Sequence, residues 1–440
     1  MYRKAIFAIV FFGAVHAWSQ VEPSATGGDV TPENDQMMMP PPVSGIAYPP
    51  AGKEETRSNY IRGGVGFTTA FDDNVLAGNF VHPVSDRIYS VLPTISLDQT
   101  TTRQHRTFSY TAGFTFYDPT NTLNEIDQIG DFQYDYRFNP RVALSIRDSF
   151  LQTSDVFSAP TELTGGQVSG TAGTPDVIAP FGARLTNAGS VGLTYQFGLN
   201  GMIGGGGTSA LLDYLHTSQV PGLFNSLNDS GTVFYSRRVS TSQYVGALFL
   251  WTHISTTPVQ SITDTFTSSI FYTLFLKRSI SVSALAGGEY SNATESGVRA
   301  AHAWTPAITA SVGWQGDHGS LAARYSRTVS AGGGLLGSYT STTANATAGW
   351  QITKMWNFTA SADYGLNKNE TPIQFSSSAG GHSIAGTVSL GYSFMEHYSI
   401  DGGYDRLHES YSGIQAISND PDSNREFISI SYHFNKPLGR

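Results

Sequence analysis

The chain has no cysteine among its 440 residues, so it has no disulfides, no thiolate chemistry and no site for a lipid anchor on cysteine. Charged residues are also scarce, at 13%, against about 25% in ordinary soluble domains. Beyond Ala17, no apolar run is long enough for a membrane-spanning helix. These absences argue against a disulfide-rich secreted domain, a thiol enzyme and a helical membrane protein.

Glycine and aromatic residues are abundant instead, with 47 glycines and an aromatic share of 12%. Low charge with modest hydropathy suits a sheet that has one face in lipid and the other in water. The net charge of -9 argues against a nucleic-acid partner, which would need a basic face.

The first residues have the features of a secretory signal. Arg3 and Lys4 precede the apolar run 5–12, and Val15-His16-Ala17 offers a cleavage site. The following segment is rich in proline, glycine and polar residues and has no apolar periodicity. We therefore expect a signal peptide at 1–17, a disordered periplasmic extension at 18–57 and one folded domain at 58–440.

From Tyr60 onward the apolar residues repeat with a period of two, as in β-strands with one apolar face. Segments 131–138 and 356–366 are clear examples, and their lengths are close to the roughly 9 to 11 residues that a tilted strand needs to cross a bilayer. Aromatic residues close many of these segments, most of them about 40 residues apart, the spacing of a repeated two-strand unit. They are Phe138, Phe197, Phe275, Trp314, Trp350, Phe394 and Phe434.

These segments predict an all-β transmembrane antiparallel barrel of about 18 strands (16–18), with both termini in the periplasm. Their expected starts are near 60, 88, 104, 127, 141, 186, 202, 229, 241, 264, 278, 302, 319, 339, 354, 382, 397 and 424. The longest connection, 153–183, is expected to be a solvated external loop, with folding into the lumen as the alternative. A soluble β-propeller is the rival fold, because its blades also repeat near this spacing.

No residue pattern indicates catalysis or a cofactor. The eleven histidines are scattered singly, without the spacing of a zinc site, so we predict no metal. The runs Gly204–Gly207 and Gly332–Gly334 lack the lysine and helix of a phosphate loop, and no serine has a recognisable base and acid beside it. A barrel hydrolase stays a minor alternative, and the chain is predicted not to be an enzyme.

Charged residues expected on the inward face are the candidate functional set, because rings of charge govern selectivity in a water-filled lumen. The alternative is that they pair across the wall and only hold the sheet. The candidates are Asp131, Asp135, Arg137, Arg147, Asp213, Arg237, Arg324, Asp363, Asp401 and Asp405.

Several short motifs resemble known barrels. Phe71-Asp72-Asp73-Asn74-Val75 resembles the turn of the bacterial outer-membrane barrels described as β-barrel porin type 2. Segments 326–334, 350–364 and 428–434 with the tail 436–440 resemble uncharacterised barrels of acidobacterial type. The resemblance covers the chain from about 60 to its end. It implies an outer-membrane barrel, in some members associated with exopolysaccharide systems, and carries no functional residues.

The sequence therefore predicts a porin-like channel in the cell outer membrane of a Gram-negative envelope, passing small hydrophilic solutes by diffusion. Its expected partners are outer-membrane lipid, the barrel assembly machinery and a polysaccharide or small solute. The alternative is a non-conducting structural barrel or a component of exopolysaccharide assembly and secretion.

Overall fold

The computed structural model describes residues 59–438, apart from 78–81, 158–181, 260, 278, 296–300, 317, 370–379, 395–396 and 418–419. The predicted signal peptide and extension lie outside the described residues. No helix in the described part of the chain is long and apolar enough to span a bilayer.

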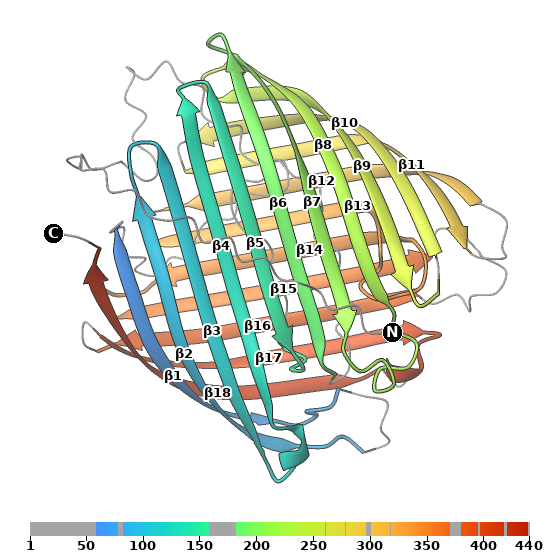
Figure 1. Ribbon diagram of the computed structural model, residues 1–440. Coiled ribbons are helices and arrows are strands. Elements are labelled where there is room, and N and C mark those ends of the chain that lie inside the picture. Colours follow the sequence, from blue (N-terminus) through green and yellow to red (C-terminus); the bar gives the residue numbers. More distant parts are fainter. Residues whose placement is uncertain are drawn as a thin grey trace.

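Eighteen antiparallel strands form one closed sheet (Figure 1), because β1 pairs with both β2 and β18. The strands are β1 (Tyr60–Asp72), β2 (Asp86–Thr100), β3 (Gln104–Asp118), β4 (Glu125–Asn139), β5 (Val142–Thr153), β6 (Arg184–Phe197), β7 (Gly201–Tyr214), β8 (Asn225–Ser240), β9 (Gln243–Thr257), β10 (Ser261–Lys277), β11 (Ile280–Glu295), β12 (Ala301–Gln315), β13 (Gly319–Ser330), β14 (Tyr339–Gln351), β15 (Trp356–Asn369), β16 (Gly380–Ser393), β17 (Tyr398–Ser412) and β18 (Asp422–Pro437). The predicted barrel and its strand number are confirmed. The largest error in a strand start is at β8, predicted from 229 and observed from Asn225.

The connections differ between the two ends of the barrel. Tight turns such as that between Asn139 and Val142 follow the even strands, and Tyr60 and Pro437 lie at this same end, which we call the short-turn end. The odd strands are followed by longer segments at the opposite end, which we call the loop end, except after β9, where only residues 258–260 separate it from β10. Two of these contain 3-10 turns, Asn121–Leu123 and Gln415–Ile417.

Side chains alternate between the two faces of the wall. Large apolar side chains such as Phe67, Ile95 and Val191 are exposed on the outside. Near the short-turn end, aromatic rings from neighbouring strands meet on this outer face, with centroids 5.8 Å apart for Trp314 and Trp350. The predicted row of aromatics above the short turns is therefore present at this pair. Ring closure removes the two outer edges that an open sheet would have, because β1 pairs with β18.

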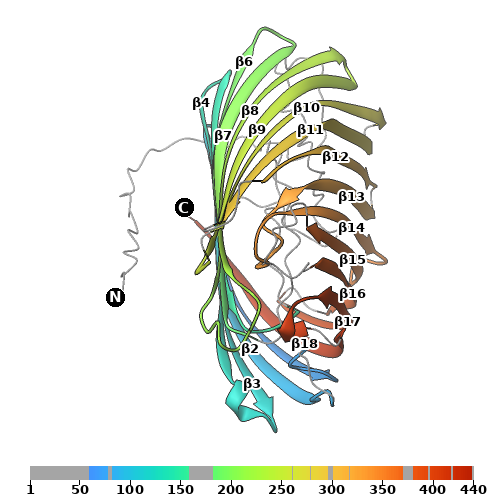
Figure 2. The same ribbon diagram turned by 90° about the vertical axis from the view of Figure 1, so that its right-hand side faces the viewer.

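The wall is incomplete between β12 and β13. β12 pairs with β13 only from Ile308↔Arg327 to Gln315↔Ser320, whereas β13 and β14 stay paired up to Ser330↔Tyr339. Figure 2 shows β13 and β14 curving toward the inside of the barrel at their loop ends. The Val329 N–H there donates a 2.9 Å hydrogen bond to the Glu289 carboxylate on β11. The end of the β13–β14 hairpin has thus left the wall.

The hairpin tip joins two other loops in a buried apolar cluster, which we call the loop cluster. Leu335 and Tyr339 of the hairpin pack with residues of β7, of the β7–β8 loop and of the β17–β18 segment. Its members are Leu212, Tyr214, Val220, Leu223, Leu335, Tyr339, Tyr411, Ile414 and Ile417. The Phe224 N–H donates to the Gly334 carbonyl at 2.7 Å, which ties two of the loops together. The loop cluster therefore fills part of the loop end of the barrel.

The connection after β5 also enters the lumen. Val156 is 1% exposed and packs with Leu407 of β17, and Phe157 packs against the same group. Only the first residues, 154–157, and Gly182-Ala183 are described in this connection. The expected external loop is therefore wrong for 154–157, which take the inward alternative, and residues 158–181 lie outside the described part.

Candidate functional site

The Asp72-Asp73-Asn74 motif fastens the first strand to the last. The Asp72 carboxylate accepts hydrogen bonds from Arg425 and Ser423, and Asp73 accepts two from Asn424, at 2.7 and 2.8 Å. The Asn74 side chain donates to the Asp422 carbonyl at 2.8 Å. The motif thus locks the barrel closure at the loop end, where β1 and β18 finish pairing.

Arg425 extends this lock to the connection after β5. Its guanidinium binds both carboxylate oxygens of Asp155, at 2.7 and 2.8 Å, while it also binds Asp72 at 3.0 and 3.1 Å. The Phe157 ring lies 4.5 Å from the guanidinium carbon. A bidentate, charge-assisted pair is among the stronger polar contacts in proteins. We call Asp72, Asp155 and Arg425 the clasp.

The clasp keeps the carboxylate of Asp155 ionised. Burial alone would raise the pKa of Asp155, but the adjacent Arg425 guanidinium holds that pKa below its ordinary value. Asp155 therefore stays charged at neutral pH and keeps the connection inside the barrel.

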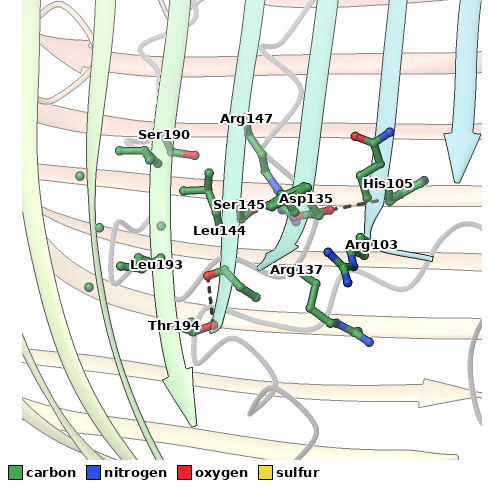
Figure 3. Close-up of a pocket in the computed structure, with 18 of the residues that line it drawn as sticks. Arg103, His105, Asp135, Arg137, Leu144, Ser145, Arg147, Ser190, Leu193 and Thr194 are labelled. Carbon is green, nitrogen blue, oxygen red and sulfur yellow. Dashed lines mark hydrogen bonds and ion pairs between the residues drawn. The ribbon is translucent and has the colours of Figure 1, made fainter. Parts of the chain in front are cut away.

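A cavity of about 540 Å³ opens on the inward side of β3 to β8 near the short turns (Figure 3). We call it the vestibule. Charged groups project into it from neighbouring strands, and His105 lies 3.9 Å from an Asp135 oxygen and 3.5 Å from an Asp98 oxygen. Its lining includes Arg103, His105, Asp135, Arg137, Arg147 and Ser190. The vestibule thus carries charged groups among apolar ones, and its arginines outnumber its carboxylates among these residues.

Arg147 is the most buried of the three vestibule arginines. The side chain is only 8% exposed, and its Nε and Nη1 have no hydrogen-bond partner among the described residues. It sits across from Gln133, next to the pair Asp135↔Ser145. Gly206 of β7 also lines the cavity on the inner face, where an added Cβ would collide with the Val191 carbonyl oxygen. A guanidinium in this setting can bind an oxygen of a passing solute.

The structure brings part of the predicted residue set together. Asp135, Arg137 and Arg147 line the vestibule, and Asp131 accepts a 2.9 Å hydrogen bond from Ser149 on the same inner face.

Four further candidates face inward on other strands, where they alternate with exposed outer residues. They are Arg324 on β13, Asp363 on β15, and Asp401 and Asp405 on β17. These four lie away from the vestibule.

Two candidates lie on the other face. Asp213 alternates with the buried Leu212 and Tyr214 and bonds to Asn225, and Arg237 follows the exposed Val233 and Tyr235 with the same parity. Both point outward, in contrast to the sequence prediction. The error arose because the polar pattern near strand ends no longer distinguishes lipid-facing from lumen-facing positions.

Sequence reasoning missed the residues of the clasp as well as Arg103 and His105. The Asp72-Asp73-Asn74 motif was visible, but its partner Arg425 is 353 positions away. Among the described residues, no group of three or more His, Asp or Glu side chains is arranged to hold a metal ion.

No family model and no curated protein sequence matches the chain. Among solved structures it is similar to OpdK of Pseudomonas aeruginosa, solved with vanillate, with a TM-score of 0.42 and 7% identity over 86% of this chain and 99% of that one. OccAB4 of Acinetobacter baumannii gives 0.40 and 9% over 86% and 99%. The ferric-catecholate import receptor Fiu of E. coli K12 gives 0.41 and 10% over 86% and 82%. Values this low carry no information on solute or mechanism.

Proposed function

We propose that this protein is an outer-membrane channel through which small hydrophilic solutes diffuse passively. The observation that carries this proposal is a closed 18-stranded barrel whose outer face is apolar and whose inner face is polar. An apolar outer face suits hydrocarbon wherever neighbouring strands are paired, because paired strands leave no backbone edge for lipid to contact. An 18-stranded ring is wide enough to leave an aqueous lumen unless loops or side chains fill it.

The vestibule supports passage of charged or polar solutes. Arg147, His105 and Asp135 line a cavity of about 540 Å³. Rings of such groups bias which ions pass. In this proposal the short-turn end and both termini face the periplasm, the loops face outward, residues 1–17 are the signal and 18–57 are a periplasmic extension. Outer-membrane lipid and the barrel assembly machinery are its partners, and β-barrel porin type 2 is the family it resembles.

The loop cluster favours a second candidate function. Three segments that pack together at the loop end narrow the direct path along the barrel axis. A barrel closed in this way suits a non-conducting structural role or a component of exopolysaccharide assembly.

Single-channel recording in planar bilayers tests the proposal. Stable conductance steps from the refolded barrel support an open diffusion channel, and a salt gradient gives its ion preference. A correctly folded, heat-modifiable barrel that stays silent overturns the channel and favours the structural role.

A further inference from the structure

The incomplete ladder between β12 and β13 leaves part of one strand without a neighbour. Within the described residues, no strand pairs with Ala301–Ala307 on the side that faces β13, although β11 pairs with this stretch throughout. Pro306 lies in this stretch and has no N–H to offer to a neighbouring strand. We call the stretch between Ala301–Ala307 and β13 the seam.

An unpaired strand edge is costly in hydrocarbon, where each unsatisfied N–H or C=O costs several kcal/mol. Irregular backbone is tolerated at membrane depth where it lines a water-filled cavity or is buried in protein. Below the seam, Ile308 resumes pairing and its side chain is exposed on the outer face with Val312. The seam thus begins in the apolar part of the wall and continues to the loop end, so its edge needs water or a polar solute beside it.

The same hairpin that opens the seam also fills the loop end. Gly332, Gly333 and Gly334 all have positive φ, between 61° and 97°, which allows the tip to turn inside the barrel. A Cβ on Gly334 would lie 2.6 Å from the Tyr214 hydroxyl oxygen, so the tip fits closely against β7. The opening in the wall therefore lies at the loop end of the barrel, where the loop cluster narrows the path through the lumen.

The chemistry along the seam is amphipathic. Trp304 is 74% exposed on the outer face, and its ring lies 5.2 Å from that of Tyr290 on β11. At the lower end, Arg327 pairs with Ile308, shares the outer face with Tyr325, and has a buried Nε without a hydrogen-bond partner among the described residues. Trp304 lies four residues along β12 from Ile308, the partner of Arg327. An aromatic pair and a guanidinium separated in this way suit a molecule with an apolar body and an anionic head.

The charges at the loop end favour entry of an anion at the seam over entry along the barrel axis. Asp72, Asp155, Glu125 and Asp127 lie on the inner side below the loops. Only two arginines, Arg425 and Arg184, lie among these four carboxylates in the described part of the chain, so the group keeps a negative excess that repels an anion approaching along the axis. The vestibule at the far end instead presents Arg103, Arg137 and Arg147. An anion that enters beside Arg327 avoids the acidic region and reaches the basic one.

We infer that the seam is a lateral opening through which small amphipathic anions pass between the outer leaflet and the lumen. This inference rests on the proposed channel function and names its solute class and its point of entry. The apolar body crosses beside Trp304 and Tyr290, and the anionic head contacts Arg327.

Lipid access to the inner side of β12 tests the opening directly. Because the chain has no cysteine, single-cysteine variants can be labelled with bimane in liposomes that contain doxyl lipids. Thr305→Cys lies at the seam, and Thr309→Cys lies four positions lower on the same inward face, where β13 pairs. Val312→Cys, on the outer face, reports full lipid access.

An open seam gives strong loss of fluorescence at 305, close to that at 312, and little loss at 309. Equally weak quenching at 305 and 309 overturns the opening. This readout does not depend on transport, so it stands even if the barrel conducts nothing.

Solute flux tests the role of Arg327. We expect Arg327→Gln to slow octanoate entry into liposomes by about fivefold, as for the loss of one ion-pair contact, with arabinose entry unchanged. Arg237→Gln, on the outer face at the short-turn end, is the matched control and leaves both fluxes unchanged. Equal octanoate flux in the two variants, or parallel slowing of octanoate and arabinose by Arg327→Gln, overturns the anion site. A wild-type barrel that passes neither solute overturns the proposed function instead.

Discussion

At the residue scale, Arg425 joins segments that are far apart in the sequence. It binds Asp72 at the end of β1 and Asp155 after β5, and it belongs to β18. All three side chains are largely buried, so each charge depends on the others for compensation. The clasp therefore couples barrel closure to the inward course of the connection after β5.

Arg425→Met should destabilise the barrel by about 3–5 kcal/mol, because it leaves two buried carboxylates without their counter-charge. Urea unfolding of the barrel in phospholipid vesicles measures this change. The matched control is Arg406→Met on β17, whose ion pair with Asp422 is largely exposed at 3.4 Å and should contribute less than about 1 kcal/mol. Equal effects from the two substitutions would contradict the clasp.

Acid should release the clasp through Asp155. Its pKa is depressed in the folded barrel, so its stabilising contribution is present above the unfolded value of about 3.9 and is lost as pH falls through the lower folded value. We expect Asp155→Asn to destabilise the barrel between pH 5 and 8, and the difference from wild type to shrink as pH falls below about 3.9.

The Arg425→Met background provides the control for this pH series. There Asp155→Asn should be neutral or stabilising at pH 7, since it removes a buried carboxylate that has lost its partner. A destabilisation by Asp155→Asn that stays constant down to acid pH would show that packing, and not charge, explains the effect.

At the scale of elements, the alternation of side chains was enough to predict every strand, because period two is a local property of a half-apolar sheet. The curve of β13 was not predictable in the same way. Residues 319–330 have the pattern of an ordinary strand. The tip of the hairpin that follows them packs with Tyr214 and Ile414, which are distant in sequence, and this packing holds the strand end inside the barrel. The sequence signal was the run Gly332–Gly334, which was considered as a phosphate loop and rejected as one.

The loop cluster should control conductance. Leu335 has no exposed surface among the apolar side chains of the cluster, so Leu335→Asp would bury a carboxylate at a cost of several kcal/mol. We expect the hairpin tip to leave the cluster and the single-channel conductance to rise. Leu336→Asp, at the adjacent and partly exposed position, is the control and should leave conductance unchanged. Unchanged conductance in both variants, with both barrels folded, would mean that the cluster does not limit the path.

At the scale of the whole molecule, each strand has one face toward the lumen and one toward the outside, and a shift of one position changes the face. Residues in the middle of a strand have a clear alternation with apolar neighbours, as at Asp401, which follows the exposed Ile400. Asp213 and Arg237 lie near strand ends, where both faces carry polar residues and the alternation is lost. The face of a residue is therefore predictable only within the apolar band.

Ion selectivity should follow the face on which a charge lies. Asp401 faces the lumen, so Asp401→Asn should lower the ratio of cation to anion permeability measured as a reversal potential in a salt gradient. Asp148 lies on the outer face, bonded to Asn187 at 3.2 Å, and Asp148→Asn removes the same charge outside the lumen. It should leave the reversal potential unchanged, because the low-dielectric wall and the external salt separate it from the permeating ions. A similar shift from both variants would mean that net charge, and not the lumen, determines selectivity, and would remove the inner-face carboxylates from the conduction path.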